Sequence, residues 1–172
     1  MIDVVSAMRA GPIAHLRKWA IKRGYKIIVR GRRFFSSRIP EFDAVACYSH
    51  PKRTIVVNRD GRSKTYDQLL YIIAHELGHG EECEKNPEMW PLYVLSFRSF
   101  MSSSKDGSKI ALIAGGVVCM IEAMAFRRGE MILDELEISV PVDVSQSLRE
   151  HSLKRYRGIF GQDDKEAAAV GR

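Results

Sequence analysis

The spacing of apolar residues predicts an amphipathic helix followed by three short strands near the start of the chain. After Pro12, apolar side chains recur every three or four residues until Gly24 ends the segment, which is the pattern of a helix with one buried face. Later runs rich in branched and aromatic residues, bounded by turn formers, predict three strands over residues 25–29, 44–48 and 54–58. The turn formers at residues 49–52 predict that the last two strands form a hairpin.

A helix is expected to follow these strands. Gln68 lies three residues after Thr65, so the two can form a capping box, and the helix body is expected from residue 66 to about residue 80. Residues 81–109 combine prolines, aromatic residues and a serine-rich end. This composition predicts a partly helical insertion that ends in a flexible loop.

The remaining pattern predicts three further helices. Ser108 is expected to cap an almost wholly apolar helix, which should end at Arg127-Arg128-Gly129 because two charges and a glycine follow the apolar run. A short helix over residues 130–138 should end before Pro141, and another is expected at about residues 144–160.

Together these elements predict one α+β domain over residues 1–160 and a flexible tail over residues 161–172. The sheet is expected to be small and mostly antiparallel, to pack against helices, and to be followed by extra C-terminal helices. A chain of 172 residues has the usual length of one domain with one core. Its 45% hydrophobic and 28% charged residues are typical of a folded protein and argue against wholesale disorder.

The formal net charge is +6, and basic residues cluster towards both ends of the chain. This charge leaves an acidic partner such as nucleic acid open. A soluble basic surface explains the same charge, however, and the sequence contains no named nucleic-acid-binding motif. Nucleic-acid binding therefore remains an alternative without a motif to support it.

The cysteine content and the apolar runs indicate a cytoplasmic protein. The three cysteines are odd in number and too widely spaced for a metal knuckle or a disulfide framework. The N-terminus lacks the basic start and the apolar stretch of a signal peptide. The longest apolar run, residues 110–121, is shorter than the about 20 residues that span a bilayer, so it predicts a buried helix and no membrane partner.

The segment His75-Glu76-Leu77-Gly78-His79 carries the strongest chemical signal. On a helix, His75 and His79 project from the same face, so both imidazoles can lie about 2.0–2.1 Å from one zinc ion. Glu76 then points beside the metal and can act as the general base that deprotonates the attacking water. Chance would produce this pattern in roughly one percent of chains of this composition. The alternative is a pair of core or surface histidines that binds no metal.

Gly78 predicts a close approach to the motif helix. Glycine inside a helix costs about 1 kcal/mol relative to alanine, so it calls for a packing reason. A neighbouring strand or a substrate backbone is expected to come near at this position. Small residues on the later apolar helix, such as Gly115 and Ala125, should also let that helix pack closely against the motif helix.

A catalytic zinc needs a third protein ligand and an open position for water. The metzincin extension is excluded, since Glu82 and Lys85 stand where it requires a glycine and a histidine. Glu122 is the predicted third ligand, because a lone carboxylate in an apolar helix is costly to bury without a cation. A hydrogen bond or ion pair from Arg127 or Arg128 is the alternative explanation.

Other polar residues near these segments are expected to have structural roles. Tyr71 lies one turn before the motif, and its hydroxyl could reach the site, but core packing is the preferred interpretation. The remaining histidines are interpreted as surface or packing residues, and three acidic residues as a solvated helix face: His15, His50 and His151, and Glu130, Asp134 and Glu135.

Three segments resemble the ImmA/IrrE family of metallopeptidases: Thr54-Ile55-Val56-Val57-Asn58, Ile73-Ala74-His75-Glu76-Leu77-Gly78-His79 and Glu122-Ala123-Met124-Ala125-Phe126. Members of that family carry a strand ending in Asn, an AHELGH helix and a later E-x-EAN-x-FA helix whose glutamate is the third zinc ligand. The likeness covers roughly residues 44–126. Departures are Met120 and Met124, where the family usually has Glu and Asn, and the longer gap at residues 81–109.

The resemblance implies a zincin-like core of the gluzincin type. In it His75, His79 and Glu122 hold one zinc ion, and Glu76 is the catalytic base. The implied function is a zinc-dependent endopeptidase whose substrate is a cytoplasmic protein, often a transcriptional repressor of a phage or mobile element.

The alternative to a peptidase is a catalytically weak or inactive protein that keeps the metallopeptidase fold. Such a regulatory protein would act by binding protein or nucleic acid. The aromatic insertion around Trp90 and the basic C-terminal helix would be its contact surfaces.

Overall fold

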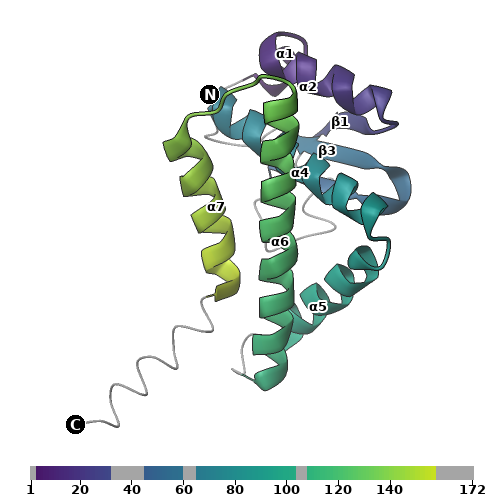
Figure 1. Cartoon of the computed structure of the whole chain (residues 1–172), viewed down its shortest axis with the longest axis vertical. Coiled ribbons are helices and arrows are strands. Elements are labelled where there is room, and N and C mark those ends of the chain that lie inside the picture. Colours follow the sequence, from purple (N-terminus) through teal and green to yellow (C-terminus); the bar gives the residue numbers. More distant parts are fainter. Residues whose placement is uncertain (1–2, 32–44, 60–64, 104–107, 158–172) are drawn as a thin grey trace, which may run out of the picture.

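The described part of the chain is α+β, with a small sheet and a larger set of helices (Figure 1). The structure is a computed structural model and describes residues 3–31, 45–59, 65–103 and 108–157. The predicted tail at residues 161–172 and most of the predicted serine-rich loop lie outside these ranges. In chain order, the elements are α1 (Val4–Ala7), α2 (Gly11–Lys22), β1 (Lys26–Arg30), β2 (Ala46–Ser49), η1 (His50–Lys52), β3 (Thr54–Asn58), α4 (Tyr66–Lys85), α5 (Met89–Ser103), α6 (Lys109–Glu135) and α7 (Val142–Arg157).

The sheet is mixed, with strand order β1-β3-β2. β2 and β3 form the predicted antiparallel hairpin around η1, whereas β1 pairs with β3 in parallel, with Lys26 opposite Thr54. The prediction of a mostly antiparallel sheet was therefore wrong, since one of the two pairings is parallel. The apolar pattern of a strand sets which face is buried and not which neighbour it takes. Central β3 is buried along its whole length.

α4 begins with the predicted capping box. The Thr65 side chain accepts a hydrogen bond from the Gln68 amide, and the Gln68 side chain accepts one from the Thr65 amide. These two bonds satisfy amide groups that the first helical turn leaves free. The helix continues to Lys85, about five residues beyond the expected end, and Pro87 follows shortly after. The motif therefore lies in the interior of a long helix, where its backbone is fixed on both sides.

α6 is one continuous helix, although the sequence predicted a break at Gly129. Ser108 caps it as expected, accepting a hydrogen bond from the Ala111 amide. Gly129 lies where α6 crosses α4: a Cβ atom there would be 2.7 Å from the carbonyl oxygen of Ala74. Gly129 is thus a packing residue and not a helix end. The expected separate helix over residues 130–138 is the last part of α6.

The predicted insertion is more helical than expected, because α5 occupies most of it. α5 packs along α6, on the opposite side from α7 in Figure 1. Phe100 of α5 covers Gly115, where an added Cβ would be 3.1 Å from the ring. Gly115 therefore allows α5 to pack closely against α6. The expectation that it allows the motif helix to do so was wrong. Tyr156 of α7 packs edge-on against the same phenylalanine at 5.6 Å.

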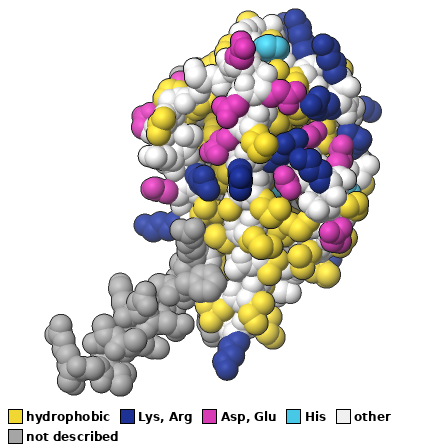
Figure 2. All heavy atoms as spheres, viewed as in Figure 1, with side chains coloured by type: hydrophobic (Ala, Val, Ile, Leu, Met, Phe, Trp, Pro, Cys, Tyr) yellow, Lys and Arg dark blue, Asp and Glu magenta, His cyan; other side chains and the backbone are white. Residues whose placement is uncertain are grey.

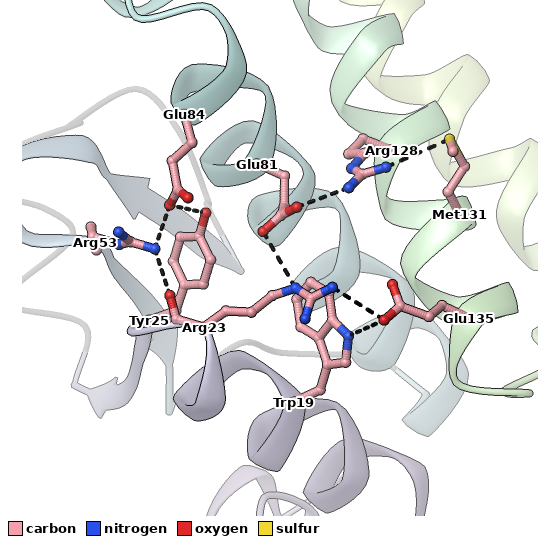
Figure 3. Close-up of polar contacts among 9 residues, drawn as sticks. All are labelled: Trp19, Arg23, Tyr25, Arg53, Glu81, Glu84, Arg128, Met131 and Glu135. Atoms are coloured by element: carbon pink, nitrogen blue, oxygen red, sulfur yellow. Dashed lines mark hydrogen bonds and ion pairs between the residues drawn. The ribbon is translucent and has the colours of Figure 1, made fainter.

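A polar network of side chains ties α2, α4 and α6 together (Figure 3). Buried Glu81 accepts a hydrogen bond from Arg128 at 2.9 Å and lies 3.8 Å from Arg23. Glu135 accepts hydrogen bonds from the Trp19 indole at 3.1 Å and from Arg23 at 3.2 Å. Glu135 is exposed, with 48% of its side chain accessible, so it lies on a solvated helix face as expected while also pairing with Trp19 and Arg23.

Apolar side chains gather over one end of the molecule, while charged side chains of both signs cover the other end in the same view (Figure 2). The most exposed large apolar residues include Ile113 at 71% and Leu95 at 63%. α6 is the single described helix long and apolar enough to cross a membrane. It packs against α4, α5 and α7 and carries the buried carboxylate of Glu122, as a core helix does. The cytoplasmic location remains a prediction.

Candidate metal centre

α4 places the two motif histidines side by side on its buried face. His75 and His79 are 7% and 6% exposed, and their ring centroids are 4.7 Å apart in an edge-on arrangement. Glu76, one position after the first histidine, is only partly buried and lines a cavity. The helix thus presents two buried imidazoles and one partly buried carboxylate to the same cavity.

α6 brings Glu122 to these histidines, although 42 residues separate it from His79 in the chain. One carboxylate oxygen lies 3.2 Å from His75 Nε2, and the other lies 3.7 Å from His79 Nε2. The three side chains are buried, and their ligand atoms lie within 4.8 Å of one another. The structure therefore brings together the three residues predicted as metal ligands. Arg128, the alternative partner of Glu122, instead contacts Glu81.

The donor set fits a zinc ion. Two imidazoles and a carboxylate form a known catalytic zinc set, and tetrahedral ligands at about 2.0–2.1 Å lie roughly 3.3 Å from one another. The observed spacings of 3.2 and 3.7 Å are close to that value.

The charges of the site favour a positive charge between the three side chains. Burial by itself raises the pKa of Glu122, but His79 and His75 lower it more, and the net carboxyl pKa is well below its ordinary value. Burial lowers the pKa of His79, whereas the charge and hydrogen bond of Glu122 raise it, and the net pKa is above 6.5. Such a buried carboxylate is stabilised by a shared proton or by a cation.

Two aromatic residues that the sequence did not single out as site residues support the centre. Phe126, one turn after Glu122 on α6, stacks on the His75 ring with centroids 3.9 Å apart. Tyr93 of α5 donates a hydrogen bond to Glu122 Oε1 at 2.8 Å. Burial first, and then the charge of Glu122, raise the pKa of the Tyr93 hydroxyl well above 10, so this group is a hydrogen-bond donor at neutral pH.

A cavity of about 390 Å³ opens onto the centre. Its lining comes from β2, α4, α5, α6 and α7 and is mainly apolar, with no lysine or arginine among the lining residues that the structure describes. The aromatic wall of this cavity is formed by three residues at helical spacing on α5: Trp90, Tyr93 and Phe97. That spacing is the sequence signal that could have predicted one functional face on α5.

The other expected residues lie apart from the ligand group. His15 is exposed, and His50 stacks on Trp90 with ring centroids 5.6 Å apart, so both are surface or packing histidines as expected. His151 is exposed and lines the cavity from α7. The Tyr71 hydroxyl donates a hydrogen bond to Glu130 at 2.7 Å, and Glu130 is outside the ligand group. The Glu130 side chain is 38% exposed, so Glu130 is partly solvated and also partnered.

Comparison of the chain with models of protein families, with curated proteins and with solved structures gave no match. The resemblance to the ImmA/IrrE family therefore rests on the three sequence segments alone.

Proposed function

We propose that the protein is a zinc-dependent endopeptidase. The observation that carries this proposal is the buried group of His75, His79 and Glu122 beside Glu76 at the wall of a cavity. Buried carboxylates are costly unless paired, and a site built only for stability would not need an open cavity next to it. The arrangement has the elements of a hydrolytic centre: three ligands, a free carboxylate and space for substrate.

The residues of the chain have distinct roles in this reaction. His75, His79 and Glu122 would hold the metal, which supplies a Lewis acid that polarises the scissile carbonyl. Glu76 accepts a proton from the attacking water and transfers it to the leaving amine. Phe126 holds the plane of the His75 ring by stacking. The apolar lining keeps bulk water away from the reacting groups and so strengthens their electrostatic interactions.

The cavity favours a peptide with an apolar side chain. β2, α4, α5, α6 and α7 line the cavity, so a bound peptide would lie between the sheet and the helices. The aromatic wall of α5 offers contacts for an apolar side chain, and the described lining offers no cation for an acidic one. A cytoplasmic repressor protein is the substrate class that the family resemblance adds.

Zinc content and peptide cleavage test this proposal together. Purified protein reconstituted with zinc should contain one ion per chain, and His79→Ala should contain none. Digestion of a mixed peptide library, read by mass spectrometry, should show cleavage next to apolar residues. Glu76→Gln should keep the zinc and lose at least about 100-fold in rate, because the general base is gone. Glu82→Gln, the same change on the same helix, should cleave like the unmodified protein.

Two results would overturn the proposal. Absence of zinc after reconstitution would show that the three candidate ligands do not form a zinc site. Tight zinc binding with no cleavage of any peptide or protein substrate, and no effect of Glu76→Gln in cells, would favour a regulatory protein that keeps the fold.

A further inference from the structure

Glu122 has a third partner in addition to the two histidines. Its Oε2 atom faces His75 at 3.2 Å, and its Oε1 atom lies 3.7 Å from His79. Tyr93 donates its hydroxyl proton to the same Oε1 atom at 2.8 Å. The carboxylate is therefore held from α4 on one side and from α5 on the other.

The position of the Tyr93 ring is set by its own packing. The ring stacks between Trp90 and Phe97, with centroid distances of 5.8 and 5.9 Å. These neighbours lie on the same face of α5, three residues before and four residues after it. α5 is in turn fixed on α6 where Phe100 covers Gly115. The Tyr93 ring also lies against the His79 ring, with centroids 5.5 Å apart. Packing within α5 and against His79 thus directs the hydroxyl at Glu122.

A carboxylate ligand needs such a partner. The last torsion of a glutamate side chain is broad and roughly two-fold, so α6 alone does not fix the plane of the carboxylate. Groups that hydrogen-bond to metal ligands set their orientation, and their loss typically weakens metal binding about 10- to 100-fold.

We propose that Tyr93 is a positioning residue, which orients Glu122 towards the two histidines and thereby raises the affinity of the site for zinc. This inference rests on the proposed zinc site. It assigns α5, which occupies most of the insertion between the motif and the third ligand, a part in building the metal centre.

Tyr71 provides a matched control within the same protein. It is also buried, and it donates a hydrogen bond of 2.7 Å to a glutamate of α6, Glu130. Its ring stacks on Phe126 at 5.7 Å. Glu130 is outside the ligand group, so removal of the Tyr71 hydroxyl should leave the orientation of Glu122 unchanged.

The test compares zinc binding by the unmodified protein, Tyr93→Phe and Tyr71→Phe. Competition with a chromophoric chelator gives the zinc dissociation constant of each. Tyr93→Phe should bind zinc about 10- to 100-fold more weakly, while Tyr71→Phe should stay within about two- to three-fold of the unmodified protein. The cobalt-substituted proteins give a second readout. The visible absorption of bound cobalt should change in Tyr93→Phe and not in Tyr71→Phe, because it reports ligand geometry.

The outcomes separate this inference from the proposed function. If the unmodified protein binds no zinc, the proposed function and this inference are both overturned. If it binds zinc tightly and Tyr93→Phe binds equally well, only the role of Tyr93 is overturned. An equal loss in both tyrosine variants, with equally lowered melting temperatures of the metal-free proteins, would show general loosening and would also overturn it. Unchanged zinc affinity with slower cleavage would place the hydroxyl on the substrate instead.

Discussion

The carbonyl oxygen of Ala125 occupies the space that a side chain on Gly78 would need. A Cβ atom built on Gly78 would lie 2.1 Å from that oxygen, far inside van der Waals contact. The approaching group is the backbone of α6, so the sequence-based expectation of a strand or a substrate at this position was wrong. Gly78 stands between the candidate ligands His75 and His79 on α4. Ala125 follows the third candidate ligand, Glu122, on α6.

Gly78→Ala should therefore separate α4 from α6. Because backbone must move, we expect a loss of about 3 kcal/mol or more in the free energy of unfolding, at the upper end of overpacking effects. Gly115→Ala is the matched control, since its Cβ would meet the Phe100 side chain at 3.1 Å and the carbonyl oxygen of Tyr156 at 3.3 Å, both much farther away than the Ala125 oxygen is from Gly78. That change should cost about 1 kcal/mol or less. Urea unfolding of both variants measures the difference, and similar midpoints would contradict the close packing.

Arg128→Met should leave Glu81 buried without its nearest cation. Both side chains are mostly buried, at 15% and 11% exposed. Removing one partner of such a pair is destabilising because it leaves the other charge buried and unpaired. We expect a loss of about 2–3 kcal/mol in the free energy of unfolding. The double variant with Glu81→Gln should recover part of this loss. Arg149→Ala, which removes a more exposed pair at 3.9 Å from Glu130, should change stability by less than about 0.5 kcal/mol.

High pH should destabilise the protein through buried tyrosines, among them Tyr25, Tyr48 and Tyr71, which lie outside the candidate metal centre. Burial is the largest cause that raises the pKa of each hydroxyl above 10.0 in the folded state. Above pH 10 the folded chain therefore binds more protons than the unfolded chain, and stability falls by about 1.4 kcal/mol per pH unit for each such tyrosine.

Denaturant titrations at several alkaline pH values would measure this slope. Tyr71→Phe should reduce it by about one tyrosine's contribution, while ultraviolet absorbance should show tyrosinate from these residues only as the protein unfolds. Ionisation of all tyrosines near pH 10 in the folded protein would contradict the prediction.

Zinc should stabilise the folded protein, because the unfolded chain does not hold the three ligands together. A free zinc concentration about 1,000-fold above the dissociation constant adds about 4 kcal/mol. The melting temperature should rise with zinc and fall again with a chelator. In His79→Ala the same additions should have little effect. A melting temperature of the unmodified protein that does not respond to zinc would count against the metal centre.

Local features of the fold could be predicted from the sequence. The capping box of α4, the cap of α6 and the hairpin of β2 and β3 each depend on residues a few positions apart. The approach of Glu122 to the motif histidines was also anticipated, because a lone carboxylate in an apolar helix calls for a partner.

Features that depend on distant contacts could not be predicted in this way. In the sequence, Gly129 looks like a helix end, yet it lies inside α6. Glycine is needed at this position because the backbone of Ala74 leaves no room for a side chain. The parallel pairing of β1 with β3 depends on the path of the chain and not on the apolar pattern of the strand. Tyr93 was visible only as part of an aromatic patch, since its role requires knowing where α5 lies against α6.

The candidate centre is complete only when α4 and α6 have packed against each other, because its ligands come from both helices. Before the two helices dock, the chain offers a metal ion only the one-turn pair of His75 and His79, which lacks the carboxylate. The complete ligand group exists only after the glycine contacts have closed and the 42 residues between His79 and Glu122 form a loop. Tight zinc uptake during refolding should therefore mark the moment at which these two helices come together.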